Sequence, residues 1–124
     1  MTLAVAYPPS IEEGRVLAKA AFRAAGMLGL SQKELAAAIG VSAASASRMK
    51  DGGFQLSGKP FELAACLVRV FRSLDAIVGG DQGVMRAWMR AANQDLGGVP
   101  RSLVLTAPGL VEVMQYLDAA RAPL

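Results

Sequence analysis

The 124-residue chain contains no histidine. Histidine is the side chain that most often acts as a general base at neutral pH, and it is also the commonest metal ligand. The acidic residues are spread singly, except for Glu12 and Glu13, a pair that suits the first turn of a helix. The glycine pairs at 52–53 and 79–80 lack the spacing of a phosphate-binding loop. The sequence therefore argues against an enzyme, and it predicts no bound metal and no cofactor.

Cysteine and long apolar runs are also scarce. Cys66 is the only cysteine, so no disulfide can form within the chain, and no signal-peptide pattern opens the sequence. No apolar run approaches the roughly 20 residues that a membrane-spanning helix needs. We therefore expect a cytoplasmic protein in which Cys66 is a small buried hydrophobe. The mean hydropathy of +0.36 is high, which we interpret as a core plus a surface for a protein partner.

Aromatic residues make up only 6% of the chain, whereas 53% of its residues are hydrophobic and alanine is abundant. Alanine is the strongest helix former, so this composition favours packed helices over sheets. We predict an all-α protein with about five main helices and one short helix. Residues 1–79 are expected to form a helix-turn-helix domain with an N-terminal arm, and residues 80–124 a small helical domain. The net charge of +3 permits nucleic-acid binding without requiring it.

The stretch from Ser31 to Gly52 has the pattern of a helix-turn-helix. Two short helical patterns flank Gly40, which can adopt the left-handed conformation of a tight turn. Ser31 and Ser42 can each cap the start of a helix. Apolar residues fall where the two helices must touch, at Leu35, Ala36 and Ile39 before the turn and at Val41, Ala46 and Met49 after it.

If this motif binds DNA, its second helix lies in the major groove with its first residues at base edges. Arg48 is the only side chain there that can make a bidentate contact to guanine. Gln32 and Lys50 suit phosphate contacts. The candidate DNA-binding residues are Gln32, Ser42, Ala43, Ala44, Ser47, Arg48 and Lys50. This small set leaves two interpretations open, a DNA-binding domain of modest selectivity or a motif that serves mainly as a scaffold.

Helical spacing continues on both sides of the motif. Ser10 and Glu13 predict a capped helix that ends at Gly29, with a basic stripe that faces either solvent or phosphate. Its expected core residues are Val16, Leu17, Ala20, Ala21, Ala24, Met27 and Leu28, and the stripe comprises Arg15, Lys19 and Arg23. A long helix should run from Pro60 to the glycines at 79–80. Its core face is expected at Leu63, Leu67, Val70, Phe71, Leu74, Ile77 and Val78.

The remaining residues predict three helices joined by tight turns. Asp81 can cap the first, in which Arg86 and Arg90 should point away from the core. Its expected core residues are Val84, Met85, Trp88, Met89 and Ala92. A loop at 93–98 precedes a short helix opened by Pro100, and Pro108 opens the last helix. The core residues of that helix are expected at Leu110, Val113, Met114 and Leu117, followed by a tail at 121–124.

The segment WMRAANQDLGGVPRSLVLTAPGLVEVMQYL carries a more particular combination of residues, each of which also suits a tightly turned helical cap. The combination consists of Trp88, Asn93, Leu96, Gly97, Gly98, Pro100, Leu103, Thr106, Gly109, Val113 and Leu117. It resembles the toxin-binding domain of the Xre/MbcA/ParS antitoxin family. In that family the segment follows an Xre-type helix-turn-helix, as it does here, and the resemblance spans about residues 30–124.

The resemblance implies a type II antitoxin whose partner is a RES-domain toxin, which attacks NAD or uses it to ADP-ribosylate a target. In such complexes the C-terminal part of the antitoxin covers or enters the active-site cleft of the toxin, and the complex can repress its own promoter. Inhibition would then be occlusion without chemistry. The implied toxin-binding residues are Asn93, Leu96, Gly97, Gly98, Pro100, Thr106, Gly109, Arg121, Pro123 and Leu124.

A simple transcriptional repressor, whose C-terminal helices only dimerise, is the competing hypothesis. Both hypotheses predict a homodimer, within a hetero-oligomeric complex if the toxin is present, because two-fold association is the default for this motif. The high hydropathy of the sequence predicts that the isolated chain self-associates.

Overall fold

The computed structural model describes residues 8–122, and this part of the chain consists of helices joined by turns and loops, with no strand. Its helices are α1 (Ile11–Leu28), α2 (Gln32–Ile39), α3 (Ala43–Met49), α4 (Gly58–Ile77), α5 (Gln82–Arg90), α6 (Pro100–Leu103) and α7 (Ala107–Arg121). The predicted all-α class is confirmed. Residues 8–122 form seven helices, whereas about five main helices and a short one were expected. The predicted N-terminal arm lies largely outside the described residues.

The helix starts follow from side chains three residues apart. Ser10 and Ser31 each form the predicted cap. In both cases the side chain of a glutamate three residues later accepts a hydrogen bond from the backbone N–H of the serine, which completes a capping box. Asp81 caps α5 by accepting a hydrogen bond from the backbone N–H of Val84 at 3.1 Å. Gly40 closes α2 with a φ of 73°, the left-handed conformation that the tight turn requires.

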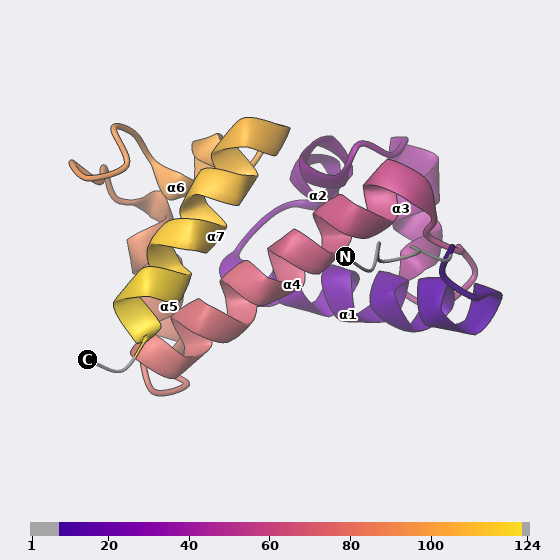
Figure 1. Cartoon of the computed structure of the whole chain (residues 1–124), viewed down its shortest axis with the longest axis horizontal. Helices are drawn as coiled ribbons and strands as arrows, with labels where there is room; N and C mark the ends of the chain where they lie inside the picture. Colours follow the sequence, from indigo (N-terminus) through magenta and orange to yellow (C-terminus); the bar gives the residue numbers. More distant parts are fainter. Residues whose placement is uncertain (1–7, 123–124) are drawn as a thin grey trace, which may run out of the picture.

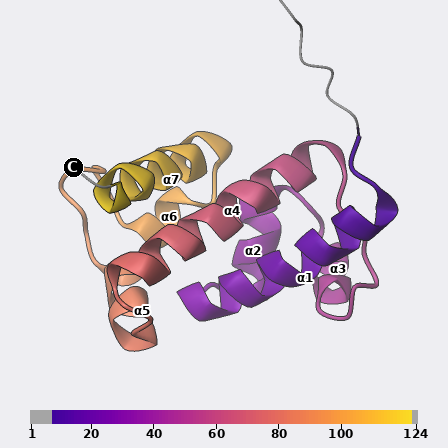
Figure 2. The same cartoon turned by 60° about the horizontal axis from the view of Figure 1, so that its bottom comes forward.

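α4 is the element that both halves of the molecule share. It packs most extensively against α1 and against α7, which lie on opposite sides of it (Figures 1 and 2). Leu67, Val70 and Leu74 of α4 are fully buried, and each such side chain contributes about 1.5–3 kcal/mol relative to an exposed one. Helices α2 and α3 lie near the start of α4, whereas α5, α6 and α7 gather around its end. The helix-turn-helix and the C-terminal helices are therefore fixed to one common support.

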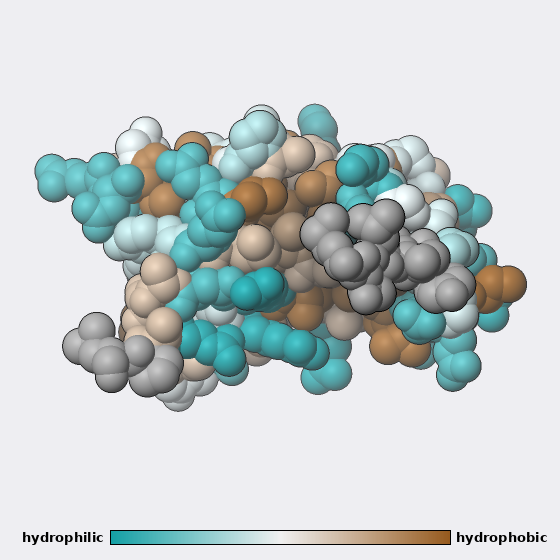
Figure 3. Space-filling view, viewed as in Figure 1, coloured by the Kyte–Doolittle hydropathy of each residue, from teal (hydrophilic) through white to brown (hydrophobic). Residues whose placement is uncertain are grey.

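Some residues expected in the core are exposed. Val16 is 61% exposed, Ile77 46% and Val84 51%, because no neighbouring helix covers their part of the apolar stripe. Ala92 lies beyond the end of α5 and is also exposed. Of these residues, Val16 lies among other apolar side chains on the surface between α4 and α1 (Figure 3). Despite this apolar character, no helix within residues 8–122 is long and apolar enough to cross a membrane.

Cys66 is only half-buried, so it is not the fully buried residue that was expected. Partial burial still raises the pKa of its thiol, because the apolar surroundings disfavour the thiolate.

Candidate functional site

α3 carries most of the candidate DNA-binding residues, and its own side chains hold it in shape. Ser42 accepts a hydrogen bond from the backbone N–H of Ser45 at 3.1 Å, and its hydroxyl donates to Ser45 Oγ at 2.9 Å. Arg48 Nη2 donates to the same Oγ at 3.4 Å. The Arg48 guanidinium also lies 5.6 Å from the centroid of the Phe54 ring, a cation–π distance. Arg48 is therefore exposed yet oriented from two sides.

The structure brings the predicted DNA-binding residues to one exposed region at the start of α2 and along α3. The members are Gln32, Ser42, Ala43, Ala44, Ser47, Arg48 and Lys50, all exposed. Lys19 of α1 joins this region, because its Cε would lie 3.0 Å from a Cβ placed on Gly52, just beyond α3. From the sequence, Lys19 was expected to face either solvent or a phosphate. Its contact with Gly52 was not predicted.

In the C-terminal half, the loop at 93–98 is a closed turn. The backbone N–H of Asn93 donates to the Gly98 carbonyl at 2.9 Å, and that of Gly98 donates back at 3.2 Å. Asn93 Oδ1 accepts a hydrogen bond from the backbone N–H of Leu96 at 3.1 Å, and Leu96 is buried. Gly97 has a φ of 72°, which favours glycine. These motif residues therefore stabilise the turn through hydrogen bonds to one another and through the backbone conformation of Gly97.

The junction of α6 and α7 is equally tight. Pro100 and Gly109 are buried, and Thr106 caps α7 by accepting a hydrogen bond from the backbone N–H of Gly109 at 3.2 Å. A Cβ on Gly109 would overlap the carbonyl oxygen of Leu103. Among the implied toxin-binding residues, Leu96, Pro100 and Gly109 are thus interior, whereas Gly97 and Thr106 are exposed.

Two residues that sequence reasoning missed tie this loop to α7. Tyr116 donates a hydrogen bond to Asp95 Oδ2 at 2.9 Å, and that bond raises the pKa of Tyr116. Its ring stacks with the half-buried ring of Trp88, with centroids 6.4 Å apart and planes 17° apart. No spacing rule connects positions 95 and 116, so only the fold shows their contact.

Arg121 ends α7 and is held in place. Its Nη1 donates to the hydroxyl of Ser73 at 3.3 Å, and Ser73, fully buried, donates to Asp118 Oδ1 at 2.7 Å. Arg69 Nε pairs with the other carboxylate oxygen of Asp118 at 2.7 Å. The expectation that Arg121 begins a tail is therefore wrong, because Arg121 is still helical. Pro123 and Leu124 lie outside the described residues.

Arg69, Asp118 and Arg121 line a groove of about 520 Å³ between α4 and α7. Ala65, Val68, Arg72 and Ala122 complete its wall, so the lining carries three arginines and one carboxylate. Because Asp118 is already paired with Arg69, the groove keeps a surplus of positive charge. Its chemistry suits an anionic group of a partner.

Comparison with known families divides the chain into the same two regions, the helix-turn-helix and the C-terminal helices. Residues 9–69 match the family model of the antitoxin Xre-like helix-turn-helix domain, and residues 73–122 match that of the antitoxin Xre/MbcA/ParS C-terminal toxin-binding domain. The chain belongs to the Xre/MbcA/ParS antitoxin family. It is thus an antitoxin with a toxin-binding domain, and no curated protein matches it. The two matches meet inside α4, the helix that supports both halves of the antitoxin.

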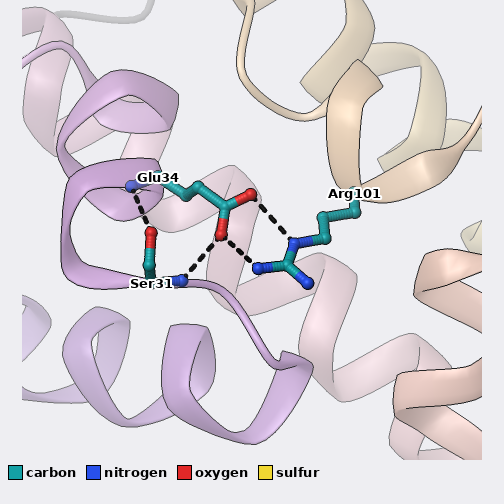
Figure 4. A network of polar contacts seen from close by, with 3 residues as sticks. All are labelled: Ser31, Glu34 and Arg101. Carbon is teal, nitrogen blue, oxygen red and sulfur yellow. Dashed lines mark hydrogen bonds and ion pairs between the residues drawn. The ribbon is translucent and has the colours of Figure 1, made fainter.

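A bidentate ion pair joins the two halves of the antitoxin (Figure 4). Arg101 Nε and Nη2 lie 2.9 and 2.7 Å from the carboxylate oxygens of Glu34. These hydrogen bonds lower the pKa of Glu34 from its usual 4.5 to about 2. Glu34 also accepts a hydrogen bond from the backbone N–H of Ser31 at 2.9 Å. The glutamate that completes the capping box of α2 is therefore also the partner of Arg101.

Arg86 makes a second connection, so the prediction that it points away was wrong. Its Nη2 donates to the Gly26 carbonyl at 2.8 Å, and its Nε donates to the Met27 carbonyl at 3.4 Å. Carbonyls in the last turn of a helix lack intrahelical partners and attract cations. Arg86 thus binds the end of α1, and Arg101 binds the start of α2.

Proposed function

We propose that this antitoxin neutralises a RES-domain, NAD-consuming toxin by covering its active-site cleft. The observation that carries the proposal is the preformed surface of the matched toxin-binding domain, in which the 93–98 turn, α7 and Arg121 are each fixed by internal hydrogen bonds. A surface that is ordered before binding loses less conformational entropy on association. Inhibition by occlusion requires only that this surface covers the cleft of the toxin, and it requires no catalytic group of the antitoxin. The resemblance of the C-terminal motif to the family that partners RES toxins supports the identity of the toxin.

We further propose that the antitoxin, as a homodimer in the toxin complex, represses its own operon through α3. The exposed surface of α2 and α3, with Arg48 oriented and Lys19 beside it, supports operator contact. Arg48 would contact a base, and Gln32, Lys19 and Lys50 would contact phosphates. These residues belong to the N-terminal half, so DNA contact leaves the 93–98 turn accessible.

Co-expression with the adjacent gene tests the toxin proposal. We expect the neighbouring product alone to stop growth and to lower cellular NAD, and we expect the antitoxin to restore both. A neighbour that stops growth at normal NAD would refute the RES assignment. A harmless neighbour would favour the simple repressor.

A charge reversal tests whether the groove at Arg121 contacts the toxin. Arg121→Glu should weaken toxin binding in a pull-down and weaken growth rescue, because it removes positive charge from the groove. Arg90→Glu is the matched control, since Arg90 is also exposed near the end of a helix but does not line the groove. Equal binding by both variants would exclude the groove from the toxin interface.

A further inference from the structure

An apolar groove runs between α1 and α4, on the face shown in Figure 3. Its volume is about 560 Å³, and its apolar lining comprises Val16, Leu17, Ala20, Phe61, Ala65 and Val68. Val16 is 61% exposed at this hollow, although it is a large hydrophobic side chain. A second hollow of about 270 Å³ shares Ala20 and Val68 and extends the groove to Met27 and Phe71. An apolar surface of this shape is typical of a protein interface.

The two ends of this groove carry opposite charge. Glu12 and Glu13, in the first turn of α1, line one end, whereas Arg23 and Arg72 line the other. Helices α1 and α4 run in the same direction along the groove (Figure 1), so the charges are separated along its length. Within residues 8–122, Glu12, Arg23 and Arg72 make no ion pair and no side-chain hydrogen bond.

We infer that two copies of the antitoxin associate through this groove. A two-fold interface must be self-complementary, because each copy presents the same patch. When the two grooves face each other in opposite directions, the acidic end of one meets the basic end of the other. The apolar middle is then covered by its own counterpart. A second copy is a partner that matches both ends at once.

This inference rests on the homodimer of the proposed function and locates its interface. The 93–98 turn and α6 lie at the other end of the molecule from the start of α1 (Figures 1 and 2), so association through the groove leaves these two parts exposed for a toxin. The groove at Arg121 shares Ala65, Val68 and Arg72 with the dimer groove, so the dimer narrows the toxin surface to the 93–98 turn, α6 and the Arg121 side of α7. A two-fold dimer also presents two α3 helices, which a helix-turn-helix protein needs to bind two operator half-sites.

Sedimentation velocity of the full-length antitoxin alone, over a concentration series, tests the apolar part of the interface. Val16→Asp should weaken dimerisation at least about tenfold, because it buries an unpaired charge. Val84→Asp is the control, since Val84 is 51% exposed on α5 and does not line the groove. Circular dichroism checks that both variants are folded.

Charge reversal tests whether the two grooves run in opposite directions across the interface. Glu12→Arg and Arg72→Glu should each weaken dimerisation about tenfold through like-charge contacts, and the double variant should recover it. An equimolar mixture of the two single variants should also associate, because opposite charges then meet at both ends. Arg15→Glu, the same charge change on α1 outside the groove, should leave dimerisation unchanged.

The outcomes separate this inference from the proposed function. Unchanged dimerisation of Val16→Asp, or a double variant and a mixture that both stay monomeric, would overturn the groove as the interface while leaving the homodimer. A wild-type protein that is monomeric at every concentration would overturn both. If deletion of residues 1–7 then restored dimerisation, the chain's own N-terminal segment would be the occupant. Toxin neutralisation is measured by growth and NAD, so its failure would not affect these results.

Discussion

The two halves of the antitoxin use their motif residues in opposite ways. In the helix-turn-helix, the candidate contact residues such as Ser47 and Arg48 are exposed, while a separate set such as Leu35 and Met49 forms the core. In the C-terminal half, Leu96, Pro100 and Gly109 are themselves buried. The residues that identify the toxin-binding domain therefore lie mostly beneath its surface. They fix the backbone that presents the exposed residues.

This difference changes where toxin contacts should be sought. The exposed parts of the C-terminal half include Gly97, Thr106, Asp95 and Arg121, and hydrogen bonds within the fold hold Thr106, Asp95 and Arg121 in place. A substitution in the motif should therefore act through stability and shape. A substitution at an exposed position outside the motif, such as Arg121, should act mainly through binding.

The largest effect is expected from Gly109→Ala. The added Cβ would overlap the carbonyl of Leu103, and backbone atoms cannot move aside without displacing α6. We expect a loss of about 2–3 kcal/mol in the free energy of unfolding, measured by urea denaturation. Gly26→Ala is the control, because its Cβ would meet no atom within 4 Å, and it should stabilise the antitoxin by about 0.5–1 kcal/mol. Equal midpoints for the two variants would show that the C-terminal motif does not fix the shape of the domain.

Arg48→Ala tests the opposite half. If Arg48 contacts a base, operator affinity should fall by about 1–3 kcal/mol in a gel shift at fixed salt, while toxin affinity stays unchanged. Arg90→Ala, in the C-terminal half, serves as the control for the loss of one exposed positive charge. An unchanged gel shift for Arg48→Ala would remove Arg48 from the base contacts.

Arg101→Leu tests the ion pair that joins the halves. We expect a loss of about 1 kcal/mol at neutral pH, since the pair is bidentate but partly exposed. Because the pKa of Glu34 is lowered from 4.5 to about 2, this stabilisation is complete above about pH 4.5 and disappears as the pH falls towards 2. Denaturation midpoints of the wild type and the variant should therefore converge in acid.

The control for the ion pair is Lys59→Leu. Lys59 pairs with Glu62 at 3.1 Å, but their side chains are 86% and 65% exposed, so solvent screens the interaction. This variant should change stability by less than about 0.5 kcal/mol at any pH. A wild-type advantage over Arg101→Leu that does not shrink in acid would contradict the assignment of the lowered pKa to Arg101.

The smallest effect is expected from Tyr116→Phe. The substitution removes the hydrogen bond to Asp95 and keeps the ring that stacks on Trp88. The turn at 93–98 should open more often, and hydrogen exchange of the Leu96 amide should become faster while global stability barely changes. If exchange at Leu96 is unaffected, the backbone bonds between Asn93 and Gly98 alone hold the turn.

Local features of the fold were predictable because their partners are three residues apart. The Ser10–Glu13 box, the Asp81 cap and the Gly40 turn each depend on atoms within one helical turn, and all three are confirmed. Burial was predicted less well. Periodicity shows that Val16 and Val84 belong to an apolar stripe, but only neighbouring helices decide whether the stripe is covered.

The sequence by itself determined the helix order, the capped helix starts and the two family domains, because these depend on local patterns along the chain. The tertiary structure alone decided which side chains meet. Arg101 reaches Glu34, Arg86 reaches the end of α1, and Tyr116 reaches Asp95. Such contacts form only when packing around α4 brings distant segments within about 3 Å, the range of a hydrogen bond. The same packing leaves the groove between α1 and α4 open.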